Sequence, residues 1–273
     1  MKNLVLVLLA LVLSSCSNIY EGAANKSTDQ ALYEDAVKAQ NAADYDTAIA
    51  KILELQANYA SYQTDATTIM LLASAYAGKC GFNFANYFTT ITTTSAGTTP
   101  LLQWFMNQWT TATTSRTYCR LAENTVKLIK PTYVGRDANQ SFFMVLLGMA
   151  KMGIYLRELV DTNRDGTADS PAFDIPGTGA FCTAANISDA NIADIGTGLS
   201  LVVANLTNIG TALSGANIGG LSTACSAFTP NPCLIEDETT FAATAANLSA
   251  IRTLLNINTA GVGIGLVNGT ACP

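Results

Sequence analysis

Apolar residues recur at helical spacing along nearly the whole chain after residue 27, and this period constrains the fold more than any other feature. A first helix is expected to begin near Gln30, after a cap at Thr28 or Asp29. Its buried face would carry Leu32, Ala36, Ala39 and Ala43. A second helix is expected over residues 45–59, with its apolar stripe formed by Ala48, Ile49, Ile52, Leu53 and Gln56. The pattern therefore predicts an all-α fold.

The small and aromatic residues of these two helices have counterparts further along the chain. The first copy comprises Tyr33, Ala39, Asp44, Tyr45, Ala48, Ile49 and Leu55. Aligning Tyr45 with Phe82 places Ala48 on Ala85, an offset of 37 residues. Residues 28–95 thus resemble a tetratricopeptide repeat (TPR), whose period is about 34 residues. The resemblance implies a TPR-like domain of stacked antiparallel helical hairpins over residues 28–160, and an unrelated α-helical bundle is the alternative.

Residues 142–156 form an apolar stretch in which Lys151 carries the only charge. A membrane-spanning helix needs about 20 such residues, so a central helix buried by its neighbours is expected here. Beyond residue 175 the chain is rich in Ala, Gly and Thr, and two further helices are expected over residues 189–213 and 238–256. Residues 175–273 are therefore expected to form a helical C-terminal region.

The N-terminus predicts an export route. Lys2 precedes an unbroken run of ten apolar residues, Leu4 to Leu13, which has the length of a signal-peptide core. The segment Leu-Ser-Ser-Cys ending at Cys16 resembles the bacterial lipobox, in which the cysteine carries the lipid. This implies a signal peptide over residues 1–15, a lipidated Cys16 and a tether over residues 16–27. Because Ser17 follows, the resemblance points to the outer membrane; an ordinary secretory signal is the alternative.

Cysteine number agrees with an exported chain. Seven cysteines are present, and lipidation of Cys16 leaves an even set of six. In an oxidising compartment such a set predicts three disulfides. The pairs expected from their segments are Cys80 with Cys119, Cys225 with Cys233, and Cys182 with Cys272. A metal site is disfavoured, because the cysteines lack the close spacing of zinc ligands.

Composition excludes several functions. The chain contains no histidine, which removes Ser-His-Asp and Cys-His catalytic sites and the commonest ligand of transition metals. The net charge is −6 without a Lys/Arg cluster, which argues against nucleic acid as a partner. An enzyme that uses only carboxylates, as glycosidases do, is still compatible with this composition.

One segment, residues 161–174, has the spacing of a calcium loop. Oxygen-bearing side chains occupy positions 1, 3, 5 and 9 and glycine occupies position 6, as in such loops. The expected ligands are Asp161, Asn163, Asp165, Thr167 through its carbonyl, Asp169 and Asp174. The loop resembles those of dockerin and thrombospondin-type proteins, which implies a structural calcium ion. The alternative is a turn that ends the preceding helix.

Taken together, these features predict a non-enzymatic scaffold or adaptor, anchored by its acyl chains in outer-membrane lipid, that binds a protein or peptide partner in the bacterial envelope. The alternative is a small-molecule-binding lipoprotein that serves a transporter, with an apolar channel near Tyr76, Phe82, Trp104 and Phe142. A third possibility is a carboxylate-only enzyme acting on envelope glycans. No residue identifies the partner.

Overall fold

The computed structural model describes residues 27–82, 101–108, 115–161, 163, 187–209 and 219–256. This part of the chain is all-α, as expected, and contains helices and short 3-10 turns but no strand. The α-helices are α2 (Asp29–Asn41), α3 (Tyr45–Asn58), α4 (Ala66–Cys80), α6 (Leu101–Asn107), α7 (Arg116–Lys127), α8 (Ala138–Val160), α10 (Asp189–Ile209), α11 (Gly219–Ser226), α12 (Glu238–Ala242) and α13 (Ala245–Asn256). The 3-10 turns are η1 (Ala60–Gln63), η2 (Tyr133–Gly135) and η5 (Pro232–Leu234).

Side-chain caps explain where several helices begin. Thr28 accepts a hydrogen bond from the Ala31 amide and starts α2, as expected from the sequence. Asp65 accepts from the Thr68 amide at 2.7 Å and starts α4. At α8, Asp137 and Gln140 form a reciprocal capping box, which satisfies the backbone N–H groups at both positions. The starts of these helices are therefore encoded locally.

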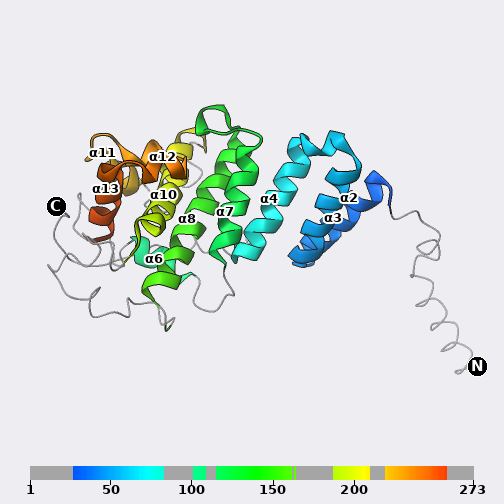
Figure 1. The fold of residues 1–273 in the computed structure, drawn as a ribbon, viewed down its shortest axis with the longest axis horizontal. Coiled ribbons are helices and arrows are strands. Elements are labelled where there is room, and N and C mark those ends of the chain that lie inside the picture. The colour runs from blue at the N-terminus through cyan, green and yellow to red at the C-terminus, as the bar shows by residue number, and fades with distance from the viewer. Residues whose placement is uncertain are drawn as a thin grey trace, which may run out of the picture.

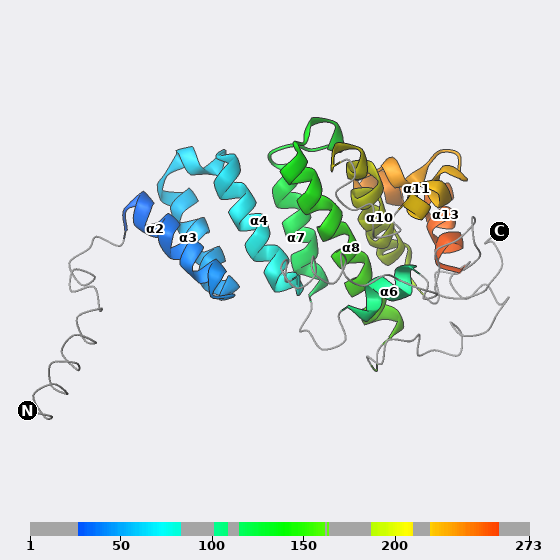
Figure 2. The same cartoon turned by 180° about the vertical axis from the view of Figure 1, so that it is seen from behind.

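The helices from α2 to α10 form a row in which each packs against the next. Helix α2 packs on α3, α3 on α4, α4 on α7, α7 on α8 and α8 on α10, and Figures 1 and 2 show the same order from opposite sides. Helix α6 lies against α8, whereas η5, α12 and α13 lie against α10. The molecule is therefore elongated along the row, with its thickest part at the α8–α10 end.

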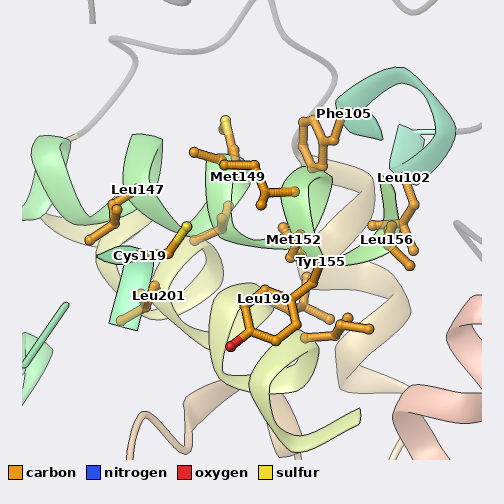
Figure 3. Close-up of a cluster of buried hydrophobic side chains, with 14 of the residues drawn as sticks. Leu102, Phe105, Cys119, Leu147, Met149, Met152, Tyr155, Leu156, Leu199 and Leu201 are labelled. Atoms are coloured by element: carbon orange, nitrogen blue, oxygen red, sulfur yellow. The ribbon is translucent and has the colours of Figure 1, made fainter. Parts of the chain in front are cut away.

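The main core lies between α8 and α10. A Cβ at Gly148 of α8 would lie 2.6 Å from the Gly198 carbonyl oxygen of α10, so the two helices approach closely only because both residues are glycine. Figure 3 shows the apolar side chains of α6, α8 and α10 that gather there. Nearly the whole of α8 is buried, which confirms the expected central helix.

Helix α10 is long and apolar enough to cross a membrane by length and composition, with a mean hydropathy of 1.3 in its most apolar window. However, 78% of that window is buried inside the protein. Its apolar side chains contact α8, α12 and α13 instead of lipid. Among the described residues, α10 therefore behaves as a core helix.

Two disulfides join neighbouring elements, and both have the pairing expected from the sequence. Cys80 at the end of α4 bonds to Cys119 of α7, with the Cα atoms 4.8 Å apart. Cys225 of α11 bonds to Cys233 of η5, with the Cα atoms 5.9 Å apart. The third expected pair, Cys182 with Cys272, lies outside the described residues.

Some details of the expected helices were wrong. Leu53 is 45% exposed, and Leu55 takes its place in the buried stripe of α3. Ala43 lies in the turn after α2, with a φ of 57°, instead of on the face of that helix. The single helix expected over residues 238–256 is divided into α12 and α13, with Ala243 and Thr244 between them.

Candidate binding cavity

A cavity of about 590 Å³ lies between the N-terminal helices and the first turns of α8. Its volume is within the range of about 300–1,000 Å³ that is typical of ligand sites. Helices α2, α3, α4 and α8, together with the turns after α2 and α4, contribute to its walls. The described lining residues are Gln40, Asn41, Ala43, Tyr45, Met70, Ser74, Ala77, Phe82, Asn139, Phe142 and Phe143.

A tight turn and a glycine place Tyr45 in the cavity wall. Ala43 adopts the left-handed conformation, and the Asp44 amide donates to the Ala39 carbonyl at 2.9 Å, so the chain reverses between α2 and α3. The ring of Tyr45 then lies against α4 at Gly78, where any Cβ would overlap the ring. Tyr45 is therefore positioned by the absence of a side chain on the neighbouring helix.

The cavity lining combines two kinds of side chain. Phe82, Phe142 and Phe143 supply aromatic rings, whereas Gln40, Asn41 and Asn139 supply amide groups. None of the described lining residues carries a charge. An ion would lose its hydration there without gaining a partner of opposite charge. The lining therefore favours a neutral guest with an apolar body and hydrogen-bonding groups.

Gln40 has an additional property. Its Oε1 atom is buried and has no hydrogen-bond partner among the described residues. A buried acceptor without a partner is unfavourable, because the group has lost water and gained nothing in exchange. Because almost none of this oxygen is accessible, a molecule in the cavity could reach it only after the Gln40 side chain moved.

The aromatic residues that the sequence suggested for a ligand channel divide into two groups. Phe82 and Phe142 line the cavity as expected. Tyr76 instead stacks on Tyr118 with a centroid separation of 6.1 Å, and the Trp104 side chain is buried in the main core with 5% exposure. Phe82 and Phe142 therefore lie at the cavity, whereas Tyr76 and Trp104 are not among its described lining residues.

Further along α8 from this cavity, the row of helices contains a buried ion network centred on Lys151. Its Nζ donates to Glu123 Oε2 of α7 at 2.7 Å and to Thr197 Oγ1 of α10 at 2.8 Å. Asp194 Oδ1 of α10 lies 3.3 Å from the same nitrogen. Lys127 also donates to Glu123, with a distance of 2.5 Å. The network thereby joins the three central helices.

The charges in this network stabilise one another. Burial opposes the charged form of Lys151, but Glu123 and Asp194 outweigh it and raise the pKa of the lysine. Burial likewise opposes the charged form of Glu123, but Lys151 and Lys127 outweigh it and lower the pKa of that carboxyl. Both groups are therefore ionised at neutral pH, although both are almost completely inaccessible to water.

A second buried pair extends the network. Arg136 Nη1 donates to Glu236 Oε1 at 2.5 Å and to Asn205 Oδ1 of α10 at 3.1 Å. Lys127 reaches the Glu236 carbonyl oxygen at 2.6 Å and so links this pair to Glu123. Sequence reasoning missed Glu236, because an acid just before a helix is explained by the helix dipole alone. Lys151, the only charged residue in the apolar stretch 142–156, was the signal in the sequence that a buried acidic partner had to exist.

The expected calcium ligands are only partly within the described residues. Asp165, Thr167, Asp169 and Asp174 lie outside them. Asp161 ends α8, is fully buried and forms an ion pair with Arg157 of the same helix, whereas Asn163 is exposed. In this arrangement Asp161 does not present a free carboxylate to a cation. No group of three or more His, Cys, Asp or Glu side chains suitable for a metal occurs in the described part of the chain.

Cys16, the signal peptide and the tether lie outside the described residues and stay predictions from the sequence. Comparison of the chain with known protein families, with curated proteins and with solved structures finds no match to any of them.

Proposed function

We propose that this chain is a non-enzymatic adaptor of the bacterial envelope, anchored in the outer membrane through Cys16, that holds a segment of a protein partner in the cavity between α2–α4 and α8. The observation that carries the proposal is the uncharged cavity with aromatic and amide walls. A polypeptide segment offers what such walls bind, namely apolar side chains and neutral backbone amides.

The arrangement of the first helices supports the TPR-like part of this proposal. Helix α2 packs on α3, and α3 packs on α4, through the small residues Ala36, Ala39, Ala48 and Ala75. Repeat proteins of this kind expose extended surfaces that receive a partner segment. The adaptor would use the end of such a unit, where it meets α8, as its binding site.

A photocrosslinking amino acid at Ser74 tests this function directly. Ser74 lines the cavity, whereas Ser61 of η1 is exposed and is not among the lining residues, so it provides a matched control. The lipidated protein would carry benzoylphenylalanine at either position in intact cells. We expect one envelope protein to be captured from position 74 and not from position 61, with the crosslinks confined to one segment. Capture of no protein by a folded, membrane-bound variant would contradict the adaptor function.

A small-molecule carrier is the second candidate, favoured by the cavity volume and by Phe82 and Phe142 in its wall. It predicts a stoichiometric small molecule in native mass spectra of the purified protein. A carboxylate-only enzyme receives no support from this cavity, because its described lining residues include neither Asp nor Glu.

A further inference from the structure

Three large apolar side chains are exposed close together at one edge of the row of helices. Leu128 and Val134 lie in the chain between α7 and α8 and are 73% and 77% exposed, and Leu234 of η5 is 46% exposed. The two segments are neighbours, because Tyr133 and Leu234 line the same hollow of about 430 Å³. The described part of the chain has only two other exposed large hydrophobic side chains. Leu128, Val134 and Leu234 therefore form an apolar patch.

The charges near the patch do not form a basic surface. Lys130, Asp137 and Asp237 are exposed and lie close to the patch in sequence, and each of the two aspartates caps a helix. Arg136 is buried and forms an ion pair with Glu236. A partner attracted by positive charge therefore finds no excess of it here, and contact with apolar groups is the main attraction that the patch offers.

The start of α2, where the tether leaves the described structure, lies beside the turn between α3 and α4. The Tyr59 hydroxyl donates to the Ser27 carbonyl at 2.9 Å, and the Tyr62 hydroxyl of η1 donates to Asp29 Oδ2 at 3.1 Å. The tether therefore leaves at the edge of the row where α4 begins.

The apolar patch lies at the same edge. The disulfide between Cys80 and Cys119 joins the end of α4 to the first turn of α7, and Figures 1 and 2 show that the two helices run in opposite directions. The end of α7 therefore lies at the edge where α4 begins. Leu128 follows α7 directly, so the patch and the start of α2 share one long edge of the molecule.

The length of the tether favours this edge as the one that faces the membrane. With the lipid on Cys16, the eleven residues 16–26 connect the membrane to the start of the described structure. A linker of eleven residues spans about 18 Å on average. Helix α4, which has 15 residues and crosses from one edge to the other, is about 23 Å long. The edge at which the tether leaves is therefore the edge held next to lipid.

We propose that the apolar patch docks on the lipid surface in which the chain is anchored, with its three side chains entering the boundary between headgroups and acyl chains. The proposal rests on the lipid anchor of the proposed function and adds the orientation of the protein on the membrane. Apolar side chains that enter this boundary leave water. Because the anchor already holds the protein at the membrane, a small patch is enough for the second contact.

A fluorescent reporter at Val134 tests the docking. The lipidated protein would carry a solvatochromic fluorescent amino acid at position 134, in phosphatidylcholine vesicles with or without lipids brominated in their acyl chains. We expect a blue-shifted emission that the brominated lipids quench. Ala42 is the control position, because it is exposed at the end of α2, at the opposite edge. Its reporter should be neither shifted nor quenched. No quenching at position 134, or equal quenching at both positions, would overturn the proposal.

Two double variants separate the patch from the anchor. Leu128→Asp with Leu234→Asp removes the rest of the patch, so the reporter at position 134 should lose its quenching while the acyl chains still hold the protein on the vesicles. Leu53→Asp with Leu121→Asp is the matched control, because both leucines are exposed but lie on α3 and α7 outside the patch. This variant should keep the quenching. Quenching that survives the loss of Leu128 and Leu234 would contradict the docking.

Other occupants of the patch give different results. A blue shift at position 134 that grows with protein concentration in the absence of lipid would assign the patch to a second copy of the chain and overturn the proposal. Quenching that appears only when the vesicles contain phosphatidylglycerol would indicate binding by charge and would also overturn it.

The docking and the adaptor function fail in different ways. Capture of a protein from position 74, together with an unquenched reporter at position 134, would overturn the docking and leave the adaptor function standing. Quenching at position 134 without any protein captured from position 74 would support the docking and contradict the adaptor function.

Discussion

Gly78 of α4 leaves the space that the ring of Tyr45 of α3 occupies, so the two residues together shape one wall of the cavity. Gly78→Ala should therefore displace the ring. Overpacking costs about 1–3 kcal/mol, which exceeds the gain of about 0.5–1 kcal/mol that alanine brings to a helix. We expect a net loss of about 1 kcal/mol in the free energy of unfolding, measured with urea, and weaker binding of any cavity guest.

Gly135→Ala is a suitable comparison for this variant. A Cβ there would lie 3.1 Å from Lys130 Cδ, which belongs to a flexible side chain that can move aside. Its effect should stay within about 0.5 kcal/mol. An unchanged stability of Gly78→Ala would mean that the Tyr45 ring is not confined by α4.

Removing Lys151 should be among the most damaging single substitutions in the protein. Lys151→Met leaves Glu123 and Asp194 buried without their shared cation, and breaking a buried ion pair in this way costs about 3–5 kcal/mol. Adding Glu123→Gln should recover part of that loss, because it removes a buried negative charge that only Lys127 would still neutralise. Urea unfolding of the two single variants and the double variant measures this coupling.

Lys38→Met serves as the control for the loss of a lysine, since Lys38 is exposed at the end of α2. We expect a change of less than about 0.5 kcal/mol. Strictly additive effects of Lys151→Met and Glu123→Gln would show that the two side chains do not interact.

The network also predicts the response of stability to acid. The pKa of Glu123 is lowered in the folded protein, mainly because Lys151 and Lys127 outweigh the effect of burial. Its contribution is therefore complete above its unfolded pKa of about 4.3 and is lost as the pH falls through the lower folded value. Each carboxyl that takes up a proton on unfolding changes the free energy of unfolding by up to about 1.4 kcal/mol per pH unit. The free energy of unfolding should fall steeply below about pH 4.3, and Glu123→Gln should flatten that slope.

If the free energy of unfolding falls equally steeply in acid for the unaltered protein and for Glu123→Gln, carboxyls other than Glu123 cause the loss of stability. Lys151 has a raised pKa, so its contribution is complete below its unfolded pKa of about 10.4 and declines only as the pH rises through the folded value. Between about pH 6 and 9 the contribution of this pair to stability should therefore be complete and should not change with pH.

The two observed disulfides should contribute unequally. Cys80 and Cys119 are 39 residues apart, whereas Cys225 and Cys233 are 8 residues apart. The loop-entropy relation gives about 3.9 kcal/mol for the first and about 2.5 kcal/mol for the second. Replacing the first pair by serines should therefore lower the Tm more than replacing the second. It should also weaken cavity binding, because the first pair ties α4 to α7 beside the cavity. Equal Tm losses would argue against the loop-length explanation.

The calcium loop stays a prediction from the sequence. The ion pair between Asp161 and Arg157 adds a condition that this prediction has to meet. A calcium ion that uses Asp161 must compete with Arg157 for the carboxylate. If the loop binds calcium, millimolar calcium should raise the Tm of the unaltered protein and leave that of Asp165→Ala unchanged. If the Tm is the same with calcium and with a chelator, Asp161 ends α8 and is not a calcium ligand.

The elements that could be predicted are those that depend on neighbours in sequence. Thr28 was expected to cap α2 and does so, because its side chain bonds to an amide three residues later. The pairing of Cys80 with Cys119 followed from the segments that they join. The partners of Lys151 could not be identified in this way, because Glu123 and Asp194 are 28 and 43 residues distant and only packing brings them together.

Helix α10 has the length and hydropathy of a membrane span, and yet it carries Asp194 and Asn205. In the folded protein Asp194 faces Lys151, where its charge is paired. In lipid the same carboxylate would have no such partner, and an aspartate costs about 2.5–3.5 kcal/mol at the centre of a membrane helix. For an exported chain, the acid that completes the core would therefore also keep α10 from stopping in the inner membrane during translocation.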